Sequence, residues 1–433
     1  MIRLRIGLLI AIFLMIGFSC NQQPSEEAAE TIQTQTKKKV TAKDILGNPD
    51  YRAISYGGYR QNSRDIQPTV EELKEDMKIL FAMGIRVLRT YNTKLKHAST
   101  ILEAIHELKG ENPDFEMYVM VGAWIDCENA WTDHPNHEVE SLEANTGEIQ
   151  RAVEMANKYP DIVKVIAVGN EAMVKWAASY FVQPWVILKW VNHLQELKKT
   201  DKLPKDLWVT SSDNFASWGG GDSVYHAPDL EVLVKAVDYI SLHTYPMHDT
   251  HYNPIFWGTL ENEVLLSDEE KVEKAMMRAK EYAKSQYDST VNYMKSLGVE
   301  KPVHIGETGW ASSSNGFYGN DGSKATDEYK EGLYHQYMRE WTDSEGISCF
   351  YFEAFDEIWK DAQNTGGSEN HFGLFTIDGQ AKYALWDLVD KGAFKGLTRG
   401  GKPIGKTFNG DKEALLKEVK NPPIKAVLIG QYY

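Results

Sequence analysis

The chain has 433 residues, of which 42% are hydrophobic and 25% charged, a balance typical of globular proteins. Its 62 acidic residues outnumber its 47 Lys and Arg residues, so the formal net charge is −15. Because nucleic acids and anionic lipids are both bound through basic surfaces, this charge argues against a nucleic-acid partner and against electrostatic adhesion to a membrane.

Residues 1–19 predict a bacterial lipoprotein signal peptide. Arg3 precedes the apolar run Ile6–Phe18, which is shorter than the roughly 20 residues that span a bilayer. Cys20 follows, and the residues before it resemble the site at which such a Cys is lipidated, although Gly17 stands where Leu is usual. The alternative is ordinary secretion with an incidental Cys.

Residues 20–48 predict the lipidated Cys and a flexible tether. Asn21–Lys39 is rich in Gln, Glu, Thr and Ala and has little to bury. Glu26 and Glu27 resemble the acidic signals that send some lipoproteins to the cell surface. We therefore expect the protein at the bacterial outer membrane or cell surface, anchored through Cys20.

Residues 49–396 predict a single catalytic domain of the α/β class, a (β/α)8 barrel. Eight β-rich runs alternate with amphipathic stretches, and most runs are continuously apolar, as in parallel strands covered on both faces. Eight repeats favour a closed barrel over an open doubly wound sheet. The open sheet loses further support because Gly57-Gly58 lacks the GxGxxG spacing of a dinucleotide site. The predicted strands are Ala53–Tyr59, Ile85–Tyr91, Met117–Trp124, Val163–Gly169, Leu207–Ser212, Asp238–Tyr245, Val303–Glu307 and Ser348–Phe355.

Helix signals separate these runs. Thr69–Glu72 has the pattern of a capping box, and Gly84 follows where a C-terminal cap belongs. Ser267–Leu297 predicts one or two helices before the seventh strand. Residues 397–433 predict a short C-terminal extension, either packed on the barrel or forming an extra edge strand at Ala426–Gly430.

The polar residues that end the strands are the candidates for chemistry, because active sites of such barrels lie at the C-terminal ends of the strands. Strand two ends in Arg89-Thr90-Tyr91-Asn92, strand three in Trp124 and Asp126, and strand six in His243-Thr244-Tyr245. Glu353, Asp356 and Glu357 follow strand eight. Among these strand ends and that of strand five, we expect substrate contacts from Tyr91, Asn92, Trp124, Asp213 and Asn214.

Two lone carboxylates end apolar strands. Glu171 follows Val165–Asn170 on strand four, and Glu307 follows Val303–Gly306 on strand seven. Glycosidic cleavage needs two carboxyl groups that flank one bond, one protonated and one ionised. The alternative for each Glu is an ion pair at the rim, but two such residues, each beside Asn or Trp, favour catalysis.

Four ordered motifs resemble glycoside hydrolase family 17, the β-1,3-glucanases, in a bacterial lipoprotein form. The resemblance covers about residues 50–395. Ala311-Ser312 departs from the family, in which Pro is common at this place, so sugar binding there can differ. The motifs are Val168–Glu171, Gly306–Trp310, Phe352–Lys360 and His371–Phe375.

The resemblance implies a retaining mechanism in which Glu171 is the acid/base and Glu307 the nucleophile. Asn170 matches the residue that hydrogen-bonds the 2-hydroxyl of the sugar being cleaved, and Tyr245 matches a Tyr near the nucleophile. Trp310 is expected to be a stacking platform for sugar, with internal packing as the alternative.

A charged cluster is also implied by the resemblance. Glu357, Lys360 and Glu369 match residues of the family's cleft that orient carboxylates and sugar hydroxyls. A structural network of ion pairs is an equally supported interpretation of these three residues.

Taken together, the motifs predict hydrolysis of β-1,3-glucan, a laminarin-type polysaccharide or oligosaccharide, by internal cleavage. The alternatives are a β-1,3-glucanosyltransferase and a non-catalytic glycan-binding lipoprotein. We expect no organic cofactor and no metal, since Cys127 and Cys349 are too few for a disulfide framework and lack the Cys/His spacing of a zinc site. The protein is expected to be a monomer.

Overall fold

The computed structural model describes residues 39–430. The expected signal peptide, residues 1–19, and the expected lipidation site, Cys20, lie outside the described residues. Within residues 39–430, no helix has both the length and the apolar character needed to cross a bilayer.

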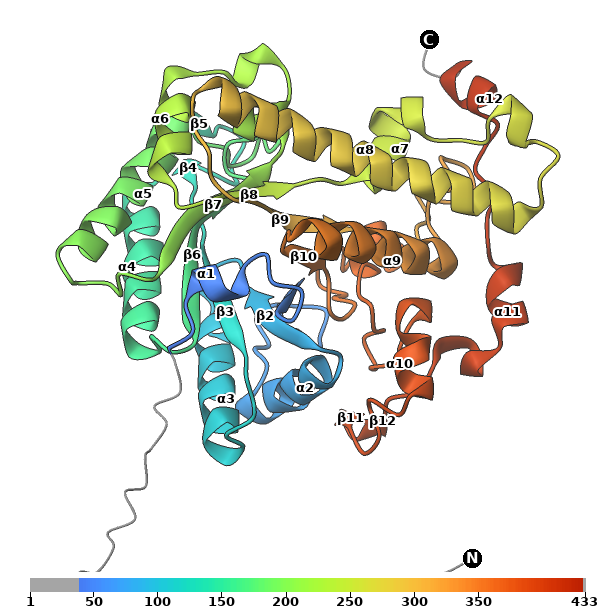
Figure 1. The fold of residues 1–433 in the computed structure, drawn as a ribbon, viewed down its shortest axis with the longest axis horizontal. Coiled ribbons are helices and arrows are strands. Elements are labelled where there is room, and N and C mark those ends of the chain that lie inside the picture. The colour runs from blue at the N-terminus through green and yellow to red at the C-terminus, as the bar shows by residue number, and fades with distance from the viewer. Residues whose placement is uncertain (1–38, 431–433) are drawn as a thin grey trace, which may run out of the picture. The chain divides into compact units, whose positions relative to one another are not determined.

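The body of the chain is a closed barrel of eight parallel strands, which confirms the predicted fold. Each strand pairs with its neighbours along the chain, and the first strand pairs with the last to close the barrel. Helices surround the strands, as Figure 1 shows. The barrel strands, all within predicted runs or one or two residues of them, are β1 (Arg52–Ser55), β2 (Ile85–Arg89), β3 (Tyr118–Ala123), β6 (Val163–Asn170), β7 (Trp208–Asn214), β8 (Ile240–His243), β9 (Val303–Gly309) and β10 (Cys349–Phe352).

Helices follow the strands and cover the outside of the barrel. The capping box before α2 is confirmed, because Thr69 accepts a hydrogen bond from the backbone N–H of Glu72 and the Glu72 carboxylate accepts one from Thr69. The segment before the seventh barrel strand is one helix, α8, which lies beside α9 (Figure 1). The helices after α1 and up to α10 are α2 (Val70–Ala82), α3 (His97–Glu111), α4 (Leu142–Lys158), α5 (Pro184–Lys199), α6 (Pro228–Ala236), α7 (Pro246–Tyr252), α8 (Asp268–Ser296), α9 (Glu328–Glu345) and α10 (Trp386–Asp390).

The barrel interior is a separate apolar core, and it includes residues that the sequence analysis placed in the tether. Alternate strand residues point inward, so Val87 and Met120 pack inside while Leu88 and Val121 pack under the helices. Helix α1 (Ala42–Ile45) contributes its own buried side chains to the interior core. The tether was expected to reach residue 48, but residues from about 42 onward belong to the folded body because their apolar side chains complete this core.

The C-terminal segment packs on the body as expected, but the expected edge strand at Ala426–Gly430 is wrong. Those residues lie in helix α12 (Lys425–Gly430). The backbone just before the helix is paired with Thr259. The Thr259 N–H donates to the Pro423 carbonyl, and the Thr259 carbonyl accepts a hydrogen bond from the Lys425 N–H. The other elements outside the barrel are the hairpins β4 (Cys127–Glu128) with β5 (Asn136–Glu140) and β11 (Thr398–Arg399) with β12 (Lys402–Pro403), and helix α11 (Lys412–Lys417).

Candidate active site

The C-terminal ends of the barrel strands open into a cleft of about 1750 Å³. Small-molecule pockets usually measure about 300–1,000 Å³, so this cleft has room for several sugar units. Aromatic rings, carboxylates and amides from the ends of all eight strands and the loops that follow them line it. The two carboxylates singled out by the sequence, Glu171 and Glu307, both face it.

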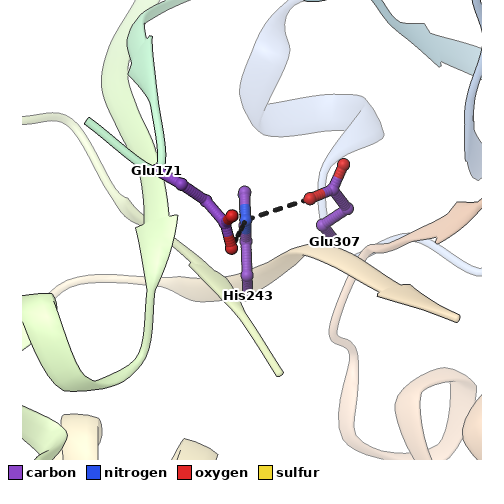
Figure 2. Close-up of side chains that lie close together, drawn as sticks. All are labelled: Glu171, His243 and Glu307. Carbon is purple, nitrogen blue, oxygen red and sulfur yellow. Dashed lines mark hydrogen bonds and ion pairs between the residues drawn. The ribbon is translucent and has the colours of Figure 1, made fainter. Parts of the chain in front are cut away.

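Glu171 and Glu307 approach each other across the cleft floor. Their side chains point toward His243 from β6 and β9, as Figure 2 shows. Ligand oxygens of the two carboxylates and a ring nitrogen of His243 all lie within 4.8 Å of one another. The Glu307 side chain is 6% exposed and that of Glu171 is 14% exposed, so both are reachable from the cleft but shielded from bulk water.

The backbone at the end of β6 aims Glu171 into the cleft. Glu171 has a φ of 45°, in the left-handed region that non-glycine residues seldom adopt. Gly169 just before it has a φ of 81°, and a side chain there would meet Ala172 at 2.9 Å. The N–H of Glu171 donates to the carbonyl of Ser212, which ties the turn to β7. Such an unusual conformation held by its neighbours is typical of functional sites.

His243 lies between the two carboxylates. Its Nδ1 is 3.1 Å from Glu171 Oε1 and 3.1 Å from Glu307 Oε2. On the other side of the ring, Nε2 lies 2.8 Å from the hydroxyl of Ser212, which in turn lies 2.9 Å from that of Ser241. Gly306 leaves space for this chain of hydroxyls, since a Cβ there would lie only 2.1 Å from Ser241 Oγ.

These contacts determine the pKa of His243 and which ring nitrogen carries its proton. Burial disfavours the charged imidazolium, but the charge of Glu307 and the hydrogen bonds to both carboxylates outweigh it and raise the pKa of His243 above its ordinary value. The ring is therefore held with a proton on Nδ1, shared between Glu171 and Glu307.

Arg89 supplies a second positive charge beneath the site. This fully buried residue lies 3.2 Å from Glu307 Oε1 and donates to the Gly306 carbonyl at 2.9 Å. Burial alone would raise the pKa of Glu307, but the charges of His243 and Arg89 prevail and lower it to about 2. Glu307 is thus an ionised carboxylate at neutral pH even though it is almost completely buried.

Two tyrosines complete the surroundings of Glu307. Tyr91 donates its hydroxyl to Glu307 Oε1 at 2.5 Å. Burial and the neighbouring charge of Glu307 raise the pKa of both Tyr91 and Tyr245 well above the ordinary value, so both hydroxyls keep their protons. They are therefore hydrogen-bond donors beside an ionised carboxylate.

The same three side chains have the spacing of a metal site, and they form the one such cluster found among residues 39–430. A metal would require His243 Nδ1 to lose its proton. The raised pKa of His243 and the contacts of Nδ1 with Glu171 and Glu307 favour a proton at that atom instead. The donor set therefore suits an acid–base pair better than a metal.

Nine of the eleven expected substrate contacts lie on the cleft. Asn170 is the best defined, because its Oδ1 accepts a hydrogen bond from Arg89 at 2.5 Å, which leaves its amide N–H groups to donate into the cleft. Trp124 donates from its indole to Asp126, and this fixes its ring on the wall. The nine residues are Tyr91, Asn92, Trp124, Asn170, Asn214, Tyr245, Glu357, Lys360 and Glu369.

The other two expected contacts, Asp213 and Trp310, are wrong. Trp310 is fully buried, donates its indole N–H to the carbonyl of Ala325 and packs against Trp257, so its ring cannot stack on a sugar. Asp213 is also fully buried and accepts hydrogen bonds from Met173 N and Ser217 Oγ. It joins the loop after β6 to the turn after β7 and so positions Glu171 indirectly.

The charged cluster after strand eight supports both interpretations given above. Lys360 lies 2.6 Å from Glu353, which is buried behind it, and 3.6 Å from Glu357. Burial, partly opposed by Lys360, raises the pKa of Glu353 well above its ordinary value. Glu357, Lys360 and Glu369 nevertheless line the cleft, so they are ion-paired and also exposed to a ligand.

Several functional residues were missed by the sequence reasoning. Arg89 and His243 were noted at strand ends but not assigned to the site, although the same position led to the assignment of Tyr91 and Asn92. Trp131 and Trp176, exposed by 60% and 63%, also line the cleft. Buried Glu148 accepts hydrogen bonds from backbone N–H groups of the loops after β2 and β3, which no local pattern signals.

This chain is similar to proteins whose names denote glucan-cleaving enzymes. The family model described as the BtgE/BtgC glycoside hydrolase domain matches residues 53–373. The crystal structure of an endo-laminarinase from Formosa Hel1_33_131 is 71% identical in sequence with a TM-score of 0.88, and the match covers 89% of this chain and 98% of that one. The glucan 1,3-beta-glucosidase of Arthroderma benhamiae is 25% identical over 334 residues, which make up 74% of this chain and 86% of that protein. The btgC protein of Aspergillus niger is 24% identical over 311 residues, which make up 70% of this chain but span only 37% of that protein.

Replacing Glu307 with Gln is expected to lower the pKa of His243, because the variant removes the largest favourable charge acting on the imidazolium. An NMR titration of the ring carbons measures this pKa, with the signal assigned from a His243→Asn variant. Glu369→Gln is the matched control, since Glu369 lies beside His248 at 3.7 Å and not beside His243. An unchanged His243 pKa in Glu307→Gln would show that the carboxylates do not hold its proton.

Proposed function

The chain belongs to the BtgE/BtgC glycoside hydrolase domain family, and on this basis we propose that it is a retaining endo-β-1,3-glucanase. The observation that carries the proposal is the short distance between Glu171 and Glu307, within 4.8 Å between oxygens. Retaining glycosidases hold their two carboxyl groups about 5–5.5 Å apart, whereas inverting enzymes need about 6.5–9.5 Å to admit a water. The spacing supports double displacement.

In the first step, Glu307 attacks the anomeric carbon of the sugar that lies over β9. Its pKa of about 2 keeps it ionised, and Arg89, His243 and the Tyr91 hydroxyl fix the orientation of its oxygens. Glu171, the more exposed of the pair, protonates the glycosidic oxygen as the bond breaks. The products of this step are a glycosyl-enzyme ester and a shortened glucan.

In the second step, Glu171 removes a proton from water, the water oxygen attacks the anomeric carbon, and the bond from that carbon to the Glu307 oxygen breaks, which frees the sugar and restores the Glu307 carboxylate. His243 lies between the two carboxyl groups throughout, and its Nδ1 donates to whichever of them is ionised. Asn170 donates from its amide to a hydroxyl of the bound sugar, since its oxygen is already taken by Arg89. The two steps together retain the anomeric configuration.

Internal cleavage of laminarin-type chains is supported by the endo-laminarinase from Formosa, which shares 71% of its sequence with this chain. The cleft also continues to both sides of the carboxylates, with Trp176 after β6 and Trp359 after β10 among its walls. The intact carboxylate pair argues against a protein that only binds glycan.

Product analysis on linear laminari-oligosaccharides tests the proposed activity and separates it from glucanosyl transfer. We expect several shorter oligosaccharides from each substrate, with the new reducing ends released as β-anomers in the first minutes, as followed by proton NMR. Release of α-anomers would overturn the retaining mechanism. Products longer than the substrate as the main outcome would favour the transferase.

Glu171→Ala and Glu307→Ala are expected to respond differently to the leaving group. Loss of a general acid costs about 10²–10⁴-fold with natural glucan, but a dinitrophenyl leaving group needs little protonation, so Glu171→Ala should keep most of its kcat/KM with the aryl glycoside, which reports the first step. Glu307→Ala should lose activity with both, because no intermediate can form. Steady-state kinetics with the two substrates measures this, and identical responses of the two variants would contradict the assigned roles.

We also propose that the protein is tied to the bacterial outer membrane or cell surface through a lipidated Cys20. The N-terminal sequence supports this, and a net charge of −15 offers no electrostatic route to the bilayer. Cys20→Ser should move the protein from the membrane to the soluble fraction without changing activity per molecule, because within residues 39–430 the first residue that lines the cleft is Gly57. Fractionation with Ser25→Ala as the control measures this, and a membrane-bound Cys20→Ser variant would contradict the anchor.

A further inference from the structure

The wall of the cleft formed after β8 and β9 extends outward as a run of aromatic rings. The ring of Tyr245 is stacked on His248 at 5.1 Å, and His248 lies 5.5 Å from Tyr318. Beyond them, Tyr252 at the end of α7 also lines the cleft. Aromatic contacts therefore continue from the ring beside Glu307 to the outer edge of the cleft.

Two rings at that edge are largely exposed. Tyr252 is 61% and Phe317 56% exposed, and their centroids lie 6.4 Å apart although they come from α7 and from the loop after β9. His251 stacks on Phe317 at 4.1 Å with an interplanar angle of 7°, so the Phe317 ring is held from one side. Single exposed apolar residues are common on proteins, but here two exposed rings from separate segments lie in edge contact, with an interplanar angle of 72°, adjacent to a ligand cleft.

The loop that carries Phe317 is fixed by hydrogen bonds. The Phe317 carbonyl accepts a hydrogen bond from Ser323 N, and the Ser323 carbonyl accepts one from the indole of buried Trp257. The Ser323 hydroxyl lies 2.7 Å from that of Thr250 on α7. A Cβ at Gly322 would lie only 1.9 Å from the Phe317 carbonyl, so the close turn requires glycine. The relative positions of Tyr252 and Phe317 are thus set before any ligand arrives.

We propose that Tyr252 and Phe317 form an outer platform that binds the β-1,3-glucan chain where it leaves the cleft. Pyranose rings present apolar C–H faces, and flat exposed side chains offer them large contact areas at little entropic cost. The platform is an additional subsite that only a chain longer than the cleft can reach. It makes the enzyme favour long glucans over short fragments, and this inference rests on the proposed glucanase function.

The test compares a long linear β-1,3-glucan with the shortest laminari-oligosaccharide that the wild type cleaves. In the double variant Tyr252→Ala/Phe317→Ala, we expect kcat/KM for the long glucan to fall about three- to tenfold through a higher KM, the size of effect that aromatic contacts give. The loss with the short substrate should stay below about twofold. Tyr252→Phe keeps the ring and should behave as the wild type with both substrates.

Trp185→Ala is the matched control, because Trp185 is an exposed aromatic residue on α5 that does not line the cleft. It should leave both values of kcat/KM unchanged. Equal losses on long and short substrates in the double variant, or no loss on the long glucan, would overturn the platform. A wild-type protein that cleaves neither substrate would instead overturn the proposed function, so the two failures are distinguishable.

Discussion

The structure is organised around keeping two carboxylates a few ångströms apart. Glu307 is buried and ionised, and a second carboxyl group, that of Glu171, lies within 4.8 Å of it, so the fold must supply compensating positive charge. Arg89 below and His243 between them do so, and both are fully buried. The supporting details follow from these two residues, including Gly306, whose missing side chain makes room for the hydroxyls that hold the imidazole.

Buried polar residues around the cleft act mainly on loops. Glu148 accepts hydrogen bonds from backbone N–H groups of two loops. Asp213 links two loops in the same way, through hydrogen bonds from Met173 and Ser217. A buried carboxylate without partners would be costly, so each fixes the loops that satisfy it. Burial raises the pKa of Asp213, and its hydrogen bonds lower it. Burial has the larger effect, so the pKa is raised to about 6. Catalytic geometry is thus held from outside the cleft as well as from its floor.

The sequence predicted what depends on local pattern. All eight strands were found because buried parallel strands are continuously apolar, and the two carboxylates were found because they end such strands. Tertiary contacts decided the rest. Trp310 follows a strand end, as the site residues do, but its ring packs inside the protein beside Trp257. Helix α1 is too short to show a helical pattern, so the sequence did not predict its place in the barrel core.

Charged residues and aromatic residues act at different places in the cleft. Arg89 and His243 act at the reacting bond, because both lie in contact with Glu307, at 3.2 and 3.1 Å. Aromatic contacts act only where a ring touches a sugar, so Tyr252 and Phe317, at the outer edge, cannot alter the ionisation of Glu307. Chain-length preference and bond cleavage are therefore set by separate residues of one wall, and either can change in evolution without disturbing the other.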